Sequence, residues 1–159
     1  KALSLAREAG EAMDESCILR CLGDVEAGRG NYAAARVLLR DSLLSNVHSD
    51  DMLEVALGLR SAAMLSFREG DFGHGATLLG AVQRAGAAVE RLLGALLSQK
   101  ERALIDAARC ALGSDFDVFE RKGAAMNTRS AIEAALRNPS RKLPGGLVTG
   151  RRLQEDTRS

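Results

Sequence analysis

The stretch from residue 21 to residue 40 decides the fold, and it reads CLGDVEAGRGNYAAARVLLR. Its first half has the apolar spacing of an amphipathic helix, its centre is a turn of glycine, a polar residue and an aromatic residue, and its second half begins another helix. The same pattern returns from residue 68 to residue 79 as REGDFGHGATLL. Gly30 and Gly70 hold the equivalent turns, 70 − 30 = 40 residues apart. A period of this length is typical of helical repeat proteins.

The composition favours a helical protein and argues against several other classes. Hydrophobic residues make up 46% of the 159 residues, but aromatic residues only 3%, which is too few for a typical β-sandwich or barrel. The two prolines, Pro139 and Pro144, follow the repeat region. A net charge of +1 lacks the basic excess expected of a nucleic-acid-binding chain. No apolar run reaches about 18 residues, so we expect no membrane span.

Residue types that carry chemistry do not form a recognisable catalytic pattern. Cys17 and Cys21 are four residues apart but have no second ligand pair, so we expect buried or half-buried thiols in a reducing compartment. His48 and His74 fall in predicted turns and are expected to be exposed structural residues. The run from 48 to 51, HSDD, is better explained by helix capping than by a catalytic triad. We therefore predict no enzyme activity, no cofactor and no metal site.

Helical apolar spacing predicts a series of helices up to residue 137, and Pro139 closes this region. The expected helices run from about 1 to 13, 15 to 28, 32 to 44, 51 to 68, 72 to 93, 99 to 112, 116 to 123 and 128 to 136. The fifth of these is unusually long and is expected to bend at Gly86. Residues 1–137 are thus predicted to form one helical repeat domain, and residues 138–159 a linker or disordered tail.

Caps and apolar faces follow from the same spacing. Ser98 and Glu101 form a capping-box pattern, and Asn127 is the expected cap of the last helix. The other expected caps are Asp14, Asn31, and Ser49 or Asp50. In the helix from 15 to 28 the residues predicted to be buried are Ile18, Leu19, Leu22 and Val25. In the next helix they are Ala35, Leu38, Leu39 and Leu43.

The repeat resembles the tetratricopeptide repeat at nine positions. They are Leu19, Leu22, Gly23, Gly30, Asn31, Tyr32, Ala35, Leu39 and Leu43. The second unit departs from the family pattern, with Ala62 and Ala63 where Leu-Gly is usual and Gly75 where alanine is usual. The longer period is similar to the MalT-like helical arrays of bacterial LuxR-type regulators and related signal-transduction ATPases. Residues 76–82 resemble a sequence motif of the final full repeat in such arrays, and residues 101–136 resemble their C-terminal capping helices.

This resemblance implies an all-α, right-handed superhelical array of antiparallel helix pairs. It also implies a non-catalytic, cytoplasmic interaction or regulatory module of a larger bacterial transcriptional regulator or signalling ATPase. Its partner would be a protein, a peptide or another domain of the parent chain, and the fragment itself would not bind nucleic acid. An alternative is a structural module for homo-oligomerisation through an exposed end of the stack, where the helix from 1 to 13 carries an apolar stripe.

In such arrays the first helix of each pair lines an inner concave surface. The family positions that face inward carry Cys17, Arg20, Asp24 and Ala27 in one unit, and Leu57, Arg60, Met64, Phe67 and Arg68 in the next. From these the predicted partner-binding residues are Arg20, Asp24, Arg60, Met64, Phe67 and Arg68. Arg20 and Arg60 occupy the same repeat position, where each could bind a carboxylate or a peptide C-terminus. The alternatives are that Arg20 only pairs with Asp24, and that Phe67 belongs to the core.

Overall fold

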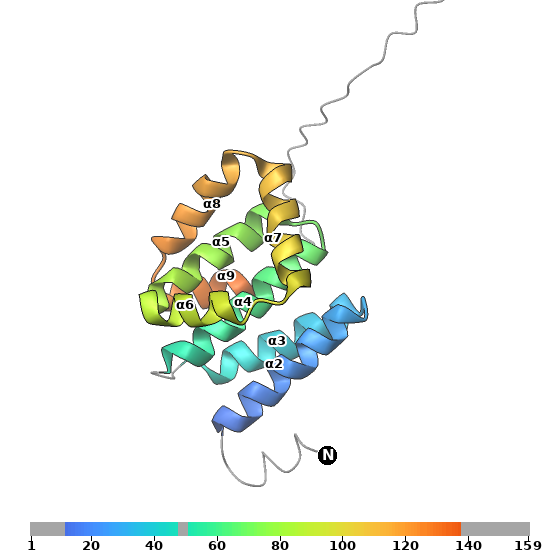
Figure 1. The fold of residues 1–159 in the computed structure, drawn as a ribbon. Helices are drawn as coiled ribbons and strands as arrows, with labels where there is room; N and C mark the ends of the chain where they lie inside the picture. Colours follow the sequence, from blue (N-terminus) through green and yellow to red (C-terminus); the bar gives the residue numbers. More distant parts are fainter. Residues whose placement is uncertain (1–11, 48–50, 138–159) are drawn as a thin grey trace, which may run out of the picture.

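The computed structural model describes residues 12–47 and 51–137, and every regular element among them is helical (Figure 1). This confirms the predicted all-α class. The elements are α2 (Ala12–Gly28), α3 (Tyr32–Ser45), α4 (Met52–Arg68), α5 (Phe72–Val82), the 3₁₀ turn η1 (Gln83–Ala85), α6 (Ala87–Ala95), α7 (Gln99–Leu112), α8 (Asp115–Ala124) and α9 (Thr128–Leu136). The predicted helix from 1 to 13 and the predicted tail from 138 lie outside the described residues, apart from the two residues that begin α2.

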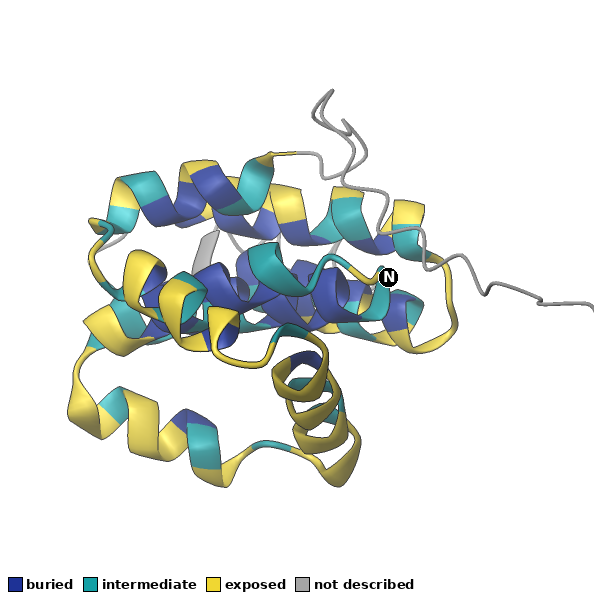
Figure 2. Cartoon of the chain, turned by 90° about the horizontal axis from the view of Figure 1, so that it is seen from above, coloured by how far each residue is buried: buried dark blue, intermediate teal, exposed yellow. Residues whose placement is uncertain are grey.

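Successive helices pack against one another at first, and then the order changes. Helix α2 packs on α3, α3 on α4, and α4 on α5. Helix α8 packs mainly on α5 rather than on its neighbour α7, and α9 contacts α3, α4 and α5 (Figure 1). Helix α4 therefore lies at the centre, and eleven of its seventeen residues are buried. Figure 2 shows the buried residues gathered in the interior and the exposed residues on the outer helices.

The turns at Gly30 and Gly70 are the same turn, repeated after 40 residues. The φ angles of these glycines are 85° and 82°, a region that glycine adopts without strain. The amide of Asn31 donates to the carbonyl of Glu26 at 2.9 Å, and the amide of Asp71 donates to that of Ser66 at 3.0 Å. The amides of both glycines also donate, each at 3.2 Å, to the carbonyl three residues earlier. Each helix end is thus closed by the same hydrogen bonds.

The caps agree with the predictions at α7 and α9 and differ at α2, α3 and α4. Asp14, the predicted cap of the helix from 15 to 28, lies inside α2, which begins at Ala12. Ser98 and Glu101 form the full capping box of α7, and Asn127 accepts a hydrogen bond from the amide of Ser130 at the start of α9. At α4 the cap is Asp51, whose carboxylate accepts from the amides of residues 53 and 54. The predicted caps Ser49 and Asp50 lie outside the described residues. At α3 the side chain of Asn31 does not cap the helix, because its Nδ2 donates instead to the Glu26 carboxylate at 2.7 Å.

The buried face of α2 is rotated from the predicted one. Leu19 is buried, but 44% of Leu22 and 48% of Val25 is exposed, so the prediction was wrong for these two residues. The reason is a close approach of the two helices at Gly23, where an added Cβ would lie 2.8 Å from the Leu39 side chain. Gly23, and not Leu22, therefore faces α3. On α3 the prediction is confirmed for Ala35, Leu39 and Leu43, which are fully buried.

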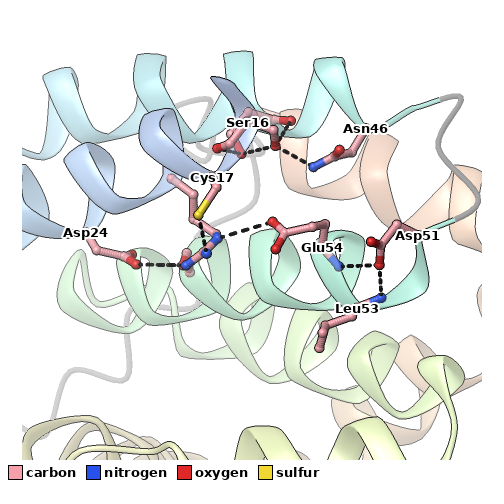
Figure 3. Close-up of polar contacts among 10 residues, drawn as sticks. Ser16, Cys17, Asp24, Asn46, Asp51, Leu53 and Glu54 are labelled. Carbon is pink, nitrogen blue, oxygen red and sulfur yellow. Dashed lines mark hydrogen bonds and ion pairs between the residues drawn. The ribbon is translucent and has the colours of Figure 1, made fainter. Parts of the chain in front are cut away.

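Polar side chains also join α2 to α3. Ser16 is fully buried, and its hydroxyl accepts a hydrogen bond from Asn46 Nδ2 at 2.6 Å (Figure 3). The Ser42 hydroxyl donates to the Ser16 carbonyl at 3.0 Å. Buried polar groups of this kind are costly unless paired, so this small network specifies how the two helices meet.

The predicted long helix from 72 to 93 is interrupted rather than bent. Helix α5 ends at Val82, the η1 turn follows, and α6 begins after Gly86. Gly86 has a φ of 97°, which is incompatible with a continuous helix. The interruption turns α6 away from α5 and lets α8 approach α5 (Figure 1).

Two glycines allow α5 and α8 to cross closely. An added Cβ at Gly80 would lie 1.9 Å from the Glu120 carbonyl oxygen, and one at Gly123 would lie 1.8 Å from the Thr77 carbonyl oxygen. No side chain larger than hydrogen fits at either position without moving a backbone. No spacing in the sequence predicted this contact between α5 and α8.

Candidate partner-binding groove

A groove of about 300 Å³ lies between α2, α4 and the start of α7. Helix α4 provides its floor, α2 one wall, and the first residues of α7 the opposite wall. The residues that line it are Asp24, Ala27, Arg60, Ser61, Met64, Leu65, Arg68, Ser98, Lys100 and Glu101. The groove thus joins three segments that are distant in the sequence.

Four of the six residues predicted to bind a partner line this groove together. They are Asp24, Arg60, Met64 and Arg68. The spacing of the repeat predicts that these side chains share a surface, and in the structure they line one groove. That this groove binds a partner stays a prediction.

Phe67 lies in the core and not in the groove. Only 3% of it is exposed, and its ring carbons lie 2.5 Å from the position that a Cβ on Gly75 would occupy. The ring therefore fills the space that glycine leaves on α5. This contact also explains why glycine stands at position 75, where the tetratricopeptide pattern has alanine.

Arg20 links α2 to α4 below the groove. It is only 9% exposed, and its guanidinium lies 3.9 Å from the Asp24 carboxylate and 3.9 Å from the Glu54 carboxylate. Its Nη2 also donates to the Cys17 sulfur at 3.5 Å (Figure 3). Arg20 does pair with Asp24, as the alternative interpretation expected, but it is buried and shares its charge with a second helix. It does not line the groove.

Arg60 has buried donors that the described part of the chain leaves unpaired. Its Nη2 lies 4.0 Å from the Glu101 carboxylate, which is an ion pair at the limit of contact. Its Nε and Nη1 are buried and have no hydrogen-bond partner in the described part of the chain. An unpaired buried donor is costly, and a bound anion or water would satisfy it.

The two carboxylates of the groove differ in their ionisation. Burial raises the pKa of Asp24, although the hydrogen bond from Ser61 at 3.0 Å and the charges of Arg20 and Arg60 act in the opposite direction. Burial alone would also raise the pKa of Glu101. The hydrogen bonds from Ser98 and the charges of Arg60 and Arg68 outweigh burial, so the pKa of Glu101 is lowered. Glu101 is thus a fixed anion, whereas Asp24 is the carboxylate that protonates more readily.

The side chains of Arg68 and Lys100 give the groove positive charge that is available to a ligand. Within the described residues neither side chain makes an ion pair within 4.0 Å. Lys100, Ser98 and Ser61 were not predicted as site residues. The capping box located the start of α7, but only the packing of the whole chain brings that start to α4.

In the part of the chain that the structure describes, the other reactive side chains do not form a second site of a familiar kind, and His48 lies outside that part. Cys21 and Cys110 are exposed and Cys17 is half-buried, so the expectation of covered thiols was wrong for the first two. His74 is half-buried rather than exposed, and burial lowers its pKa. In the described ranges no three His, Cys, Asp or Glu side chains are arranged to hold a metal ion. No helix in those ranges combines the length and apolar character of a membrane span.

Comparisons with protein-family models, with curated proteins and with solved structures find no match to this chain.

Proposed function

We propose that this chain is a non-catalytic interaction module built as a tetratricopeptide-like array. In this proposal α2–α3 and α4–α5 are two equivalent antiparallel pairs of a right-handed superhelix, and α6–α9 cap its C-terminal end. Two observations support it. The glycine turns repeat their hydrogen bonds after 40 residues, and the first helix of each pair, together with α7, lines one groove.

The groove suits an acidic segment or a C-terminal carboxylate of a partner protein. Asp24 and Glu101 each accept hydrogen bonds from serines of the groove, which satisfies the negative charges already present. Arg68 and Lys100 remain for a ligand, and Arg60 keeps two unpaired donors. Met64 and Leu65 lie beneath the groove, where they are only 4% and 5% exposed, and they make its base apolar. Hydrogen bonds between such cations and a carboxylate are among the stronger polar contacts that proteins make.

In its biological setting the module would belong to a cytoplasmic bacterial regulator of the LuxR type or to a related signalling ATPase. The groove would bind a partner protein, or another domain of the same regulator, and transmit a change of state to the output. This part of the proposal rests on the family resemblance of the sequence, and the groove adds a physical means by which it would operate.

An array of hexapeptides with graded numbers of Glu residues and a free C-terminal carboxylate tests the groove. We expect retention of the chain to rise with acidic content, and amidation to weaken it. The double variant Arg68→Ala with Lys100→Ala should weaken binding at least about tenfold. The matched control is Arg91→Ala with Arg129→Ala, which removes two exposed cations outside the groove and should bind as the wild type does. Retention that is independent of acidic content, or equal in both double variants, would overturn the proposal.

The alternative function, homo-oligomerisation, is favoured by one observation. Leu22 and Val25 on α2 are half exposed, and they form an apolar stripe at helical spacing on the face that α3 does not cover. Light scattering over a range of concentrations would decide. If the chain self-associates, Leu22→Glu with Val25→Glu should return it to a monomer, and a wild-type chain that stays monomeric would exclude this function.

A further inference from the structure

A second cavity, of about 270 Å³, lies behind the groove, between α4 and the helices α5 to α8. Its wall is mainly aliphatic, and it is formed by Leu79, Val82, Leu93, Leu97 and Ile105. Its polar lining residues are Arg60, Gln83, Glu90, Arg109 and Glu120. An apolar space with a few convergent polar groups is the usual form of a small-molecule site.

Arg60 borders both spaces, because it lines the groove on one side and this cavity on the other. Its Nε and Nη1 are buried without a hydrogen-bond partner. The nearest anion, Glu101, is 4.0 Å from Nη2 and is held by two hydrogen bonds from Ser98, so it does not close onto the guanidinium. Nε and Nη1 of Arg60 are therefore unpaired donors at the border of the cavity, and an anion in the cavity would pair with them after a small movement of the side chain.

The other charged residues of the cavity are either paired or at its rim. Arg109 lies 3.7 Å from the Asp117 carboxylate, 3.6 Å from that of Glu120, and 4.2 Å from the centre of the Phe116 ring. These contacts occupy Arg109 and offset the charge of Glu120. Glu90 is exposed at the outer wall. The charge complementarity of the cavity thus places a ligand anion at Arg60 and an uncharged, apolar body along the aliphatic wall.

We propose that this cavity binds a small amphipathic carboxylic acid, with its carboxylate at Arg60 and its hydrocarbon part among the five aliphatic side chains. This site shares Arg60 with the groove, so an acid bound here would compete with a groove ligand for that residue, but the proposal does not require that the groove binds a partner. A neutral molecule of the same shape would fill the apolar wall but leave the donors of Arg60 unpaired, and an amine would be repelled.

Calorimetric titration of the full chain with octanoate, and with octanol as the uncharged control, tests the site. We expect octanoate to bind at least about tenfold more tightly than octanol. Arg60→Met should remove this difference by weakening octanoate binding only. Arg91→Met, which changes an exposed cation of α6 outside the cavity, is the matched control and should bind octanoate as the wild type does.

A second variant keeps the test decisive if Arg60→Met does not fold. Glu101→Gln retains the capping box, since Gln also serves at that position, but removes the carboxylate that competes for Arg60. It should strengthen octanoate binding by about threefold or more. Equal affinity for octanoate and octanol, no binding of octanoate at millimolar concentration, or weaker binding by Glu101→Gln would overturn the proposal. Arg68→Ala, which tests the groove, should leave octanoate binding unchanged, so the two proposals fail separately.

Discussion

Gly80 and Gly123 set the distance between α5 and α8. Each Cα lies so near a carbonyl oxygen of the other helix that no Cβ fits. The contact holds α8 against α5. Because α7 directly precedes α8 in the chain, the contact also helps to position α7 beside the groove. A single methyl group at either position has to be accommodated by moving backbone, and not by turning a side chain.

We therefore expect Gly123→Ala to lower the free energy of unfolding by about 1–3 kcal/mol or more. The control is Gly94→Ala in α6, where a Cβ meets no atom within 4 Å. There alanine should be neutral or stabilise by up to about 1 kcal/mol, because it restricts the unfolded chain more than glycine does. Urea denaturation followed by circular dichroism measures both, and equal effects at the two positions would show that the helices are farther apart than described.

The carboxyl group of Asp24 gives a prediction about pH. Its pKa in the folded chain is raised above the ordinary value of 3.8 by burial. The folded state therefore binds the proton more tightly than the unfolded state, so this group favours folding at low pH and loses that contribution as the pH rises through its folded pKa. Asp24→Asn removes the titration and can still accept the hydrogen bond from Ser61.

The free energy of unfolding of Asp24→Asn minus that of the wild type should thus increase as the pH rises from below 3.8 towards neutral. Urea denaturation at several pH values measures the difference in the free energy of unfolding. Asp106→Asn, which removes an exposed carboxylate outside the groove, is the control variant measured beside it. A difference that decreases with pH for Asp24→Asn would mean that Asp24 is stabilised as an anion.

How far the site could be predicted depends on the range of the interactions. Asp24, Arg60, Met64 and Arg68 share a groove because the repeat places them on equivalent helix faces, and periodicity is visible in a single sequence. Phe67 was predicted for the groove because its register is also equivalent. Its ring turns inward because Gly75 leaves room for it, and this depends on a residue of the next helix. Lys100 reaches the groove only through the packing of α7, which no local pattern encodes.

At the scale of the element, the start of α7 follows local chemistry closely. The capping box at Ser98 was read from four residues and is present in full, with the Glu101 side chain accepting from the Ser98 amide at 2.8 Å. The buried face of α2 was not predicted correctly from its apolar spacing. Leu22 and Gly23 are neighbours in sequence, and the choice of which one contacts α3 depends on how closely the two helices approach.

Two serines at N-cap positions provide a matched test of one cap. Ser98 accepts a hydrogen bond from the Glu101 amide at 3.2 Å, whereas Ser114 makes no side-chain cap to α8. Ser98→Ala should therefore lower the free energy of unfolding by about 1 kcal/mol, and Ser114→Ala should change it by less than about half of that. Thermal or urea denaturation of the two variants measures the contrast. Equal decreases in the free energy of unfolding would mean that the cap hydrogen bond of Ser98 does not stabilise the folded chain.

At the scale of the whole molecule, the buried side chains are distributed unevenly. The main cluster extends over α4, α5 and the later helices, with Leu43 of α3 at its edge. A smaller cluster joins α2 and α3 to α4, and it consists of Ala27, Ala35, Leu39, Leu65 and the partly buried Tyr32. Four of the fourteen residues of α3 are buried, against eleven of seventeen in α4. The pair α2–α3 thus has less buried surface to hold it in place.

Because α2–α3 has less buried surface, we expect this pair to unfold before the rest of the chain. Repeat arrays unfold in this way when their units are coupled only through their interfaces. Hydrogen exchange should give a smaller opening free energy for the amides of α3 than for those of α4 and α5. Leu39→Ala, which truncates a buried side chain packed on Gly23, should cost about 2–5 kcal/mol and speed exchange in α2 and α3 more than in α5. Leu44→Ala, at a side chain that is 44% exposed, should leave the free energy of unfolding and the exchange rates nearly unchanged. If Leu39→Ala instead speeds exchange equally in every helix, the molecule unfolds as one cooperative unit, and α2–α3 is an integral part of a single core rather than a stacked repeat.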